Sequence, residues 1–139
     1  MKKRTVDTAE LLREHGFRAT PGRLALLELF AESKQPLTVA DIHKRMRNGM
    51  NEVTLYRAIE ALVAAGICRR IDLHQGHAVH YELAEEHHHH LVCTNCGTIE
   101  DFSSQLCDEL AAKATKASHQ FKTILTHSLE LFGLCNRCA

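Results

Sequence analysis

Apolar residues in the first part of the chain recur at the spacing of an amphipathic helix. This spacing predicts helices over residues 8–15 and 21–32. Thr20 and Pro21 suit the start of the second helix, because a Thr hydroxyl accepts an N-terminal backbone hydrogen bond and Pro is favoured in the first turn. The residues expected to be buried along these two helices are Leu11, Leu12, Leu24, Leu27 and Phe30.

Two more helices are predicted before residue 67. The third runs to residue 46 and begins at Thr38, which is followed by Asp41 in a weaker form of the capping box. The fourth covers residues 52–65 and ends at Gly66, a residue type that favours helix termination. Its inward stripe is expected to consist of Leu55, Ile59 and Leu62.

The apolar period then changes from helical to alternating. Residues 67–73 and 78–83 alternate around a turn that contains Gln75 and Gly76, which predicts a two-stranded hairpin. Helices followed by a hairpin are typical of a winged helix-turn-helix. The first unit is therefore expected to be a winged-helix DNA-binding domain over residues 1–84.

A second unit follows the polar residues 84–86. Its predicted elements are strands near residues 91–93 and 98–102, a helix over 104–119 and a strand over 123–132. The expected fold class is therefore α+β, with a small α/β domain over residues 85–139 after the winged helix.

Composition narrows the class of protein. The chain has 139 residues with equal totals of 17 for Lys+Arg and Asp+Glu, so a DNA-binding surface must come from local clustering of charge. No segment approaches the roughly 18 apolar residues of a membrane span, so we expect a cytoplasmic protein without a membrane partner. In a reducing cytosol, six Cys are expected to be metal ligands or free thiols. Cys68 and Cys107, which lie outside any Cys-x-x-Cys motif, are expected to be ordinary buried thiols.

The strongest chemical signal is a pair of Cys-x-x-Cys motifs. The first contains Cys93 and Cys96, and the second contains Cys135 and Cys138. Four thiolates in two such motifs bind one tetrahedral zinc ion, which predicts a structural zinc site with four cysteine ligands in the second unit. The alternatives are unrelated reduced thiols or a Cys-x-x-Cys redox pair, as in a thiol oxidoreductase.

The second signal is a run of four histidines directly before the strand predicted at residues 91–93. Side chains alternate faces along an extended backbone, so His88 and His90 would face one way and His87 and His89 the other. The run can therefore serve two metal ions. Its position inside a strand pattern argues against an expression tag, which is normally terminal.

Each pair of histidines needs further donors. For His88 and His90 the predicted donor is Glu82, and the other candidates are Asp72, His74, His77 and His80. For His87 and His89 the predicted donors are His127 with either Asp108 or Glu109. Imidazole and carboxylate groups suit zinc(II), iron(II) and manganese(II), so the donor types leave the metal open.

A local group of basic and aromatic residues in the first unit suits duplex DNA. The fourth helix would enter a major groove with its N-terminal residues at the base edges, where Thr54, Tyr56 and Arg57 are the candidates. Arg18 and Arg23 flank the start of the second helix and add positive charge. The alternative is a solvated basic face on a zinc-stabilised protein-interaction module.

Taken together, these residues resemble the ferric uptake regulator family over residues 17–138. The likeness rests on FRATPGRLALLELF, VTLYR, YEL…HHHHLVCTNCG and HSLELFGLCNRC. The resemblance implies a homodimeric bacterial repressor with a winged helix and a C-terminal dimerisation domain, in which metal binding shapes the dimer to fit a palindromic operator. It implies neither an enzyme nor a small-molecule substrate, and the chain has no His-Glu-x-x-His motif that would favour a hydrolase.

By position, the resemblance implies the same roles that the residue types favour. It implies structural zinc at Cys93, Cys96, Cys135 and Cys138. It implies a regulatory metal at Glu82, His88 and His90, and an additional metal at His87, His89, Asp108 and His127. In the DNA-binding domain, Tyr56 and Arg57 match the family's DNA contacts, and Arg18 matches a basic residue that reaches toward the minor groove.

The chain departs from the family pattern at the regulatory site. Iron-sensing members usually have a His just before the third helix, where this chain has Gln35, Pro36 and Leu37. Zinc-sensing members often complete the site from the wing, near Asp72, but commonly carry a Cys at the position of Glu82. Iron(II) and zinc(II) therefore both stay open as the regulatory metal, with a manganese- or peroxide-responsive member as a further alternative.

Overall fold

The chain forms two compact units, Met1–Glu85 and Glu86–Ala139. The computed structural model describes residues 6–46, 50–74, 76, 78–85, 88–103 and 105–139. The division lies one residue beyond the boundary predicted after residue 84. Within the described residues, no helix combines the length and the apolar character that a membrane span requires.

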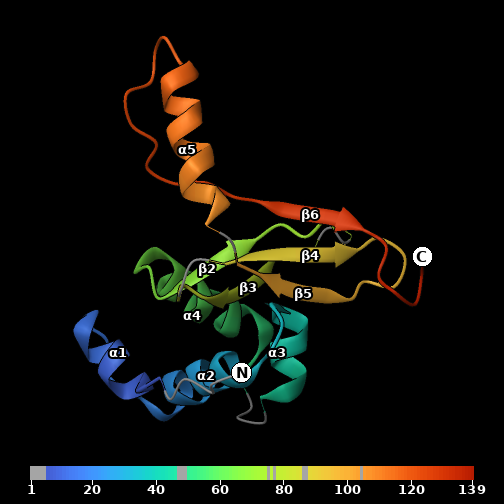
Figure 1. Cartoon of the computed structure of the whole chain (residues 1–139). Helices are drawn as coiled ribbons and strands as arrows, with labels where there is room; N and C mark the ends of the chain where they lie inside the picture. The colour runs from blue at the N-terminus through green and yellow to red at the C-terminus, as the bar shows by residue number, and fades with distance from the viewer. Residues whose placement is uncertain (1–5, 47–49, 75, 77, 86–87, 104) are drawn as a thin grey trace. The chain divides into compact units, whose positions relative to one another are not determined.

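The first unit combines helices with a small antiparallel sheet (Figure 1). Its elements are α1 (Thr8–Glu14), α2 (Pro21–Glu32), β1 (Leu37–Thr38), α3 (Val39–Arg45), α4 (Glu52–Ala64), β2 (Cys68–Ile71) and β3 (His80–Leu83). The strand order is β1-β3-β2, with Cys68 opposite Leu83 and Leu37 opposite Tyr81. The predicted helices and wing are present, and the two-residue strand β1 is an addition because two residues are too few to give an alternating pattern.

All four described helices of the first unit begin with a side-chain cap, and in α1 this is Asp7, which accepts a hydrogen bond of 3.1 Å from the Glu10 N–H. Thr20 caps α2, and Asn51 caps α4 by accepting a hydrogen bond of 2.8 Å from the Thr54 N–H. At α3 the capping box is complete, because Thr38 Oγ1 accepts from the Asp41 N–H while the Asp41 carboxylate accepts from the Thr38 N–H, both at 3.1 Å. These caps satisfy N–H groups that the helices leave without intrahelical partners.

The core of the first unit follows the predicted stripes. Leu12, Leu27 and Phe30 are buried, whereas Leu11 and Leu24 pack against this core and are only partly buried. In α4 the predicted stripe of Leu55, Ile59 and Leu62 is at most 1% exposed. The opposite face of α4 is thereby fixed toward solvent.

The end of α4 leads directly into the wing. Gly66 has a φ of 78°, and its N–H donates to the Val63 carbonyl at 3.0 Å while the Ile67 N–H donates to the Leu62 carbonyl at 2.9 Å. This pair of bonds is a Schellman motif, which needs a left-handed residue and so favours glycine. Leu62 and Ile67 are both buried, so the motif also fixes the direction in which the chain enters β2.

Glu60 joins α4 to the wing. Its carboxylate accepts a hydrogen bond of 2.7 Å from the hydroxyl of Tyr81 on β3 and one of 3.1 Å from Nε of Arg70 on β2. The bonds from Arg70, followed by that from Tyr81, lower the pKa of Glu60. The ionised carboxylate therefore holds the hairpin against the helix that precedes it.

The second unit is a small sheet with a helix in the crossover between two of its strands (Figure 1). Its elements are β4 (His89–Cys93), β5 (Ile99–Phe102), α5 (Leu106–Ala117) and β6 (Glu130–Gly133). The strand order is β5-β4-β6, in which β4 pairs antiparallel with β5 and parallel with β6. The central strand β4 therefore carries His89 and His90 of the histidine run as well as Cys93, the first zinc-motif cysteine.

The last predicted strand is much shorter than its sequence pattern indicates. Residues 118–129 form neither helix nor strand, and β6 covers only Glu130–Gly133. In the parallel register, Glu130 lies opposite His90. Since β4 begins at His89, residues 123–128 would lie beyond the start of that strand in this register and cannot pair with it.

Candidate metal sites and DNA-binding helix

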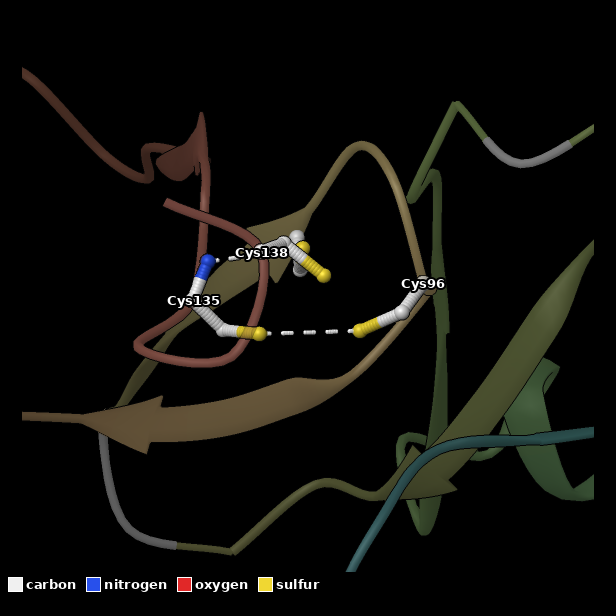
Figure 2. Close-up of side chains that lie close together, drawn as sticks. Cys96, Cys135 and Cys138 are labelled. Carbon is white, nitrogen blue, oxygen red and sulfur yellow. Dashed lines mark hydrogen bonds between the residues drawn. The ribbon is translucent and has the colours of Figure 1, made fainter.

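Four cysteine sulfurs converge at one edge of the second sheet. Cys93 ends β4 and Cys96 follows in a turn, while Cys135 and Cys138 lie in the turn after β6. Because β4 and β6 run parallel, with Cys93 opposite Gly133, both segments leave the sheet on the same side. The four Sγ atoms all lie within 4.8 Å of one another. Figure 2 shows the sulfurs of Cys96 and Cys135 pointing toward each other, 3.6 Å apart.

Hydrogen bonds favour the thiolate form at two of these cysteines. Backbone hydrogen bonds, first from Cys96 and then from Cys135, lower the pKa of Cys93 to about 6. A side-chain hydrogen bond with Thr98, at 3.1 Å, lowers the pKa of Cys96. Thiolate is the form of cysteine that binds metal, so these N–H and O–H groups prepare the site for a cation.

At Cys138, by contrast, the protonated thiol is favoured when no cation is bound. A hydrogen bond from Asn95 favours its thiolate, but hydrogen bonds with Cys135, together with burial, raise the pKa of Cys138 to about 11. Four adjacent thiols cannot all carry negative charge unless a cation compensates them. The donor set and its spacing therefore fit a tetrahedral zinc ion.

The predicted pair His88 and His90 lies beside a carboxylate. Their ring centroids are 5.0 Å apart, and His90 is 1% exposed. Asp101 is the register partner of His90 on β5, and its Oδ1 lies 3.8 Å from His90 Nε2. This arrangement supplies two imidazoles and an oxygen donor within the second unit.

Glu82, the predicted carboxylate donor from the wing, is held by an arginine. Arg69 lies opposite Glu82 in the register of β2 and β3, and its Nε donates a hydrogen bond of 2.6 Å to Glu82 Oε1. The Glu82 side chain is 13% exposed. A metal ion at this carboxylate would have to compete with the guanidinium.

The other predicted wing donors that the structure describes lie outside the clusters of metal donors. Asp72 is exposed and accepts a hydrogen bond of 2.8 Å from the backbone N–H of His74, whose ring Nδ1 lies 2.7 Å from the same oxygen. His80 is buried on β3, and burial lowers its pKa. His77 lies outside the described residues. Among the residues that the structure describes, neither Asp72, His74 nor His80 belongs to a group of three metal donors.

A second donor cluster gathers around His89. Its Nε2 lies 2.8 Å from Cys107 Sγ, and its ring centroid is 5.2 Å from that of His127. The donor atoms of these three residues all lie within 4.8 Å of one another. Asp108 is exposed on α5, and His87 lies outside the described residues. The structure thus brings together His89 and His127 of the predicted set, in company with Cys107.

The candidate DNA-binding residues of α4 lie on its exposed face. Thr54, Tyr56 and Arg57 are all exposed in the N-terminal half of the helix, on either side of buried Leu55. This arrangement leaves a polar and aromatic surface free for a groove.

The two arginines before and within α2 differ in their surroundings. Arg18 is exposed, whereas Arg23 is half-buried. The Arg23 guanidinium donates to the Arg18 carbonyl at 3.1 Å and lies 5.1 Å from the centre of the Phe17 ring. Arg23 therefore stabilises the turn that presents Arg18.

Sequence reasoning missed two donor candidates, Asp101 and Cys107. Asp101 could have been found by pairing the strand predicted at residues 98–102 with the histidine run, because antiparallel pairing places one residue of β5 opposite His90. Cys107 could have been found from the geometry of α5. Successive side chains of a helix point about 100° apart, so only one of the neighbours Cys107 and Asp108 can face the sheet.

Comparison with known proteins identifies the family. The sequence model of the ferric uptake regulator family matches residues 14–132. The chain belongs to the ferric uptake regulator family. This finding confirms the resemblance that the sequence motifs indicate, and with it a metal-responsive regulator of transcription.

Relatives match this chain over nearly its whole length. The ferric uptake regulation protein of Bordetella parapertussis is 34% identical over 137 residues, covering 95% of this chain and 96% of that protein. The peroxide operon regulator of Bacillus subtilis is 31% identical over 141 residues, covering 96% and 92%. The structure of the ferric uptake regulator from Francisella tularensis with iron has a TM-score of 0.73 at 29% identity, covering 88% of this chain and 95% of that chain. The predicted fold class is thereby confirmed.

Proposed function

We propose that this member of the ferric uptake regulator family is a homodimeric repressor that binds palindromic duplex DNA in a metal-dependent way and controls metal-uptake genes. The observation that carries the proposal is the pair of donor groups on β4, with histidines at its start and a four-thiol cluster at its end, in a chain whose other unit is a winged helix. The thiol cluster would hold structural zinc, and the histidines would hold the metal that is sensed.

The regulatory site would combine Glu82 from the first unit with His88 and His90 from the second. Asp101 is a further oxygen donor, since its carboxylate already lies beside His90, and Asp72 is the candidate donor from the wing. A cation bound by residues of both units would favour one arrangement of the DNA-binding units. Only a difference in metal affinity between arrangements can produce such a shift.

In the Arg69–Glu82 ion pair, the guanidinium of Arg69 competes with a metal ion for the Glu82 carboxylate. Arg69 neutralises the carboxylate when metal is absent, so the metal must displace a positive charge as well as water. Oxygen and imidazole donors accept iron(II), zinc(II) and manganese(II), and the Francisella tularensis relative holds iron. The additional site would include His89 and His127, with His87 as a further predicted ligand. Asp108, which the sequence also predicts there, is exposed on α5 and is not part of this proposal.

DNA recognition would be carried by the exposed face of α4. Its N-terminal half presents Thr54, Tyr56 and Arg57, the position from which a recognition helix reads base edges in the major groove. Arg18 would contact the backbone or the minor groove, in a turn supported by Arg23. Arg18, Arg23 and Arg57 provide local positive charge for binding DNA, although the net charge of the whole chain is zero.

A homodimer is supported by the surface of the second unit. Its large exposed apolar residues include Leu91, Leu106, Leu110, Leu125, Leu131 and Phe132. Leu106, Leu110 and Leu131 line one apolar pocket, and a large contiguous apolar surface is typical of an interface. A two-fold dimer would match a two-fold DNA site.

We do not propose an enzyme. A thiol oxidoreductase uses two cysteines of one motif, whereas here both motifs contribute to one group of four sulfurs. The convergence of four thiols favours a resident metal over a redox pair. A protein-interaction module is the remaining alternative, and it would not bind duplex DNA at physiological salt.

The test is a metal titration on selected DNA. Protein with zinc only in the thiol cluster would be used to select binding sequences from a pool of random duplexes, in separate experiments with iron(II), manganese(II) and zinc(II). The affinity for the selected duplexes would then be measured by fluorescence anisotropy. We expect one metal to raise duplex affinity at least about tenfold, and H88A with H90A to remove that dependence. Equal affinity with chelator and with every metal would contradict the proposal.

The DNA-binding helix is tested in the same assay. Arg57→Ala is expected to weaken duplex binding by about 1–3 kcal/mol, or roughly 5-fold to 150-fold, because a charged contact to base or phosphate is lost. Lys113→Ala removes an exposed cation from α5 and serves as the matched control. Binding by the Arg57 variant as tight as that of wild type would exclude α4 as the reading helix.

A further inference from the structure

The cluster around His89 contains a donor of a different chemical kind from the residues predicted there. We propose that His89, Cys107 and His127 form a site with two nitrogen donors and one sulfur donor, which takes a thiophilic divalent cation of the zinc(II) class. The inference deepens the proposed function, because it names the cation class of the additional site.

The geometry of the three residues suits one ion. The donor atoms all lie within 4.8 Å of one another, and Cys107 Sγ is 2.8 Å from His89 Nε2. A zinc ion with bonds of about 2.0–2.3 Å to nitrogen and sulfur separates its ligand atoms by distances of this order or somewhat more. Small side-chain movements would therefore suffice to admit a cation between them.

The fold directs Cys107 to this place. It is 5% exposed, and among the described residues of α5 it is the buried one, whereas its neighbour Asp108 is exposed. Neighbouring helix residues point about 100° apart, so the phase that aims Cys107 at β4 turns Asp108 away. The thiol, rather than the carboxylate, then completes the site.

The two histidines approach from different elements. His89 is 3% exposed in the central strand β4, and its ring lies beside that of Phe102 on β5, with centroids 6.5 Å apart. His127 is exposed in the irregular segment 118–129. The site therefore has a rigid, buried side and an exposed side, through which a cation could enter and where water could supply a fourth ligand.

A thiolate donor changes which metals such a site prefers. Soft sulfur ligands favour zinc(II) and cobalt(II) over manganese(II), which prefers oxygen. A site with the Asp108 carboxylate in place of the Cys107 thiolate would accept a wider range of divalent metals. The cysteine would thus make the additional site selective even if the regulatory site accepts several metals.

Cobalt(II) is the probe that tests this site, because thiolate ligands give it a near-ultraviolet charge-transfer band that imidazole and carboxylate ligands do not. Cobalt(II) would be titrated into full-length protein that already holds zinc in the thiol cluster, with zinc release measured in parallel. Wild type is expected to gain the thiolate band without releasing zinc, and excess manganese(II) is expected not to displace the cobalt.

Two variants and two controls complete the experiment. Cys107→Ser is expected to lose the band and to weaken cobalt binding by more than the roughly 10–100-fold that outer-shell changes cost. His127→Ala changes an exposed residue and does not disturb the core. It is expected to weaken cobalt binding as well, so it tests the site even if Cys107→Ser fails to fold. Asp108→Asn and His119→Ala are the matched controls, and both should bind as wild type does.

A band that persists in Cys107→Ser, or binding that Asp108→Asn weakens and Cys107→Ser does not, would overturn the inference. Neither readout involves DNA. Failure of the repressor proposal would therefore leave the cobalt result unchanged, and the two outcomes are distinguishable.

Discussion

At the scale of single residues, Glu60 stabilises the first unit through charge. Its side chain is 20% exposed and receives hydrogen bonds from Arg70 and from buried Tyr81. Glu60→Gln keeps the shape but removes the charge, so we expect a loss of about 1–2 kcal/mol in the free energy of unfolding. The loss would be measured by urea denaturation, followed by the fluorescence of the two tyrosines, Tyr56 and Tyr81, both of which lie in this unit.

The same residue predicts a pH dependence. Because hydrogen bonds lower the pKa of Glu60 in the folded state, its contribution is complete above the ordinary value of 4.5 and is lost as pH falls through the folded value. The difference in stability between wild type and Glu60→Gln should therefore shrink below about pH 4.5. Glu28→Gln, an exposed carboxylate on α2, is the control and should leave stability within about 0.5 kcal/mol of wild type.

At the scale of elements, the start of α4 links stability to DNA binding. Asn51 caps this helix through the Thr54 N–H, and the candidate DNA contacts follow within the next two turns. Asn51→Ala should cost about 1 kcal/mol of stability and should weaken duplex binding, because the frayed first turn no longer holds Thr54 and Tyr56 in place. Asn51→Ser retains a capping oxygen and should restore both properties. Duplex binding unchanged in Asn51→Ala would mean that DNA contacts lie beyond the first turn.

At the scale of the whole molecule, the two units differ in what holds them together. The first unit has an extensive apolar core, whereas the buried residues in the described part of the second unit are His89, His90, Val92, Cys93 and Cys107. Such a small core needs support, and a metal that joins the ends of β4 and β6 supplies it. Removal of zinc should therefore unfold the second unit and leave the first folded.

Hydrogen exchange measured by mass spectrometry would check this expectation. With a strong chelator or with Cys135→Ser, backbone amides of β4 and β6 should lose protection while those of β2 and β3 keep it. Cys68→Ala, at a buried cysteine of the first unit whose pKa burial raises to about 12, should retain zinc and full protection in the second unit. Simultaneous loss of protection in both units would show that their stabilities are coupled.

Most of the element structure was accessible from sequence because it depends on local patterns. The stripe of Leu55, Ile59 and Leu62, the cap at Thr38 and the stop at Gly66 all follow from neighbours a few residues apart. The strand over residues 123–132 was overextended because its true length depends on where β4 begins, which is information from another part of the chain.

The sequence by itself determined which chemistry the molecule holds: two Cys-x-x-Cys motifs, four consecutive histidines and a helix with one polar face are visible as residue types at fixed spacings. Only the tertiary structure decided which donors meet. Strand register set Asp101 beside His90 and paired Arg69 with Glu82, and the phase of α5 turned Cys107 toward His89 while leaving Asp108 in solvent. The physical reason is that spacing along the chain fixes which face a side chain takes within its own element, whereas its partner is set by register and helix phase between elements, where a shift of one residue exchanges one donor for another.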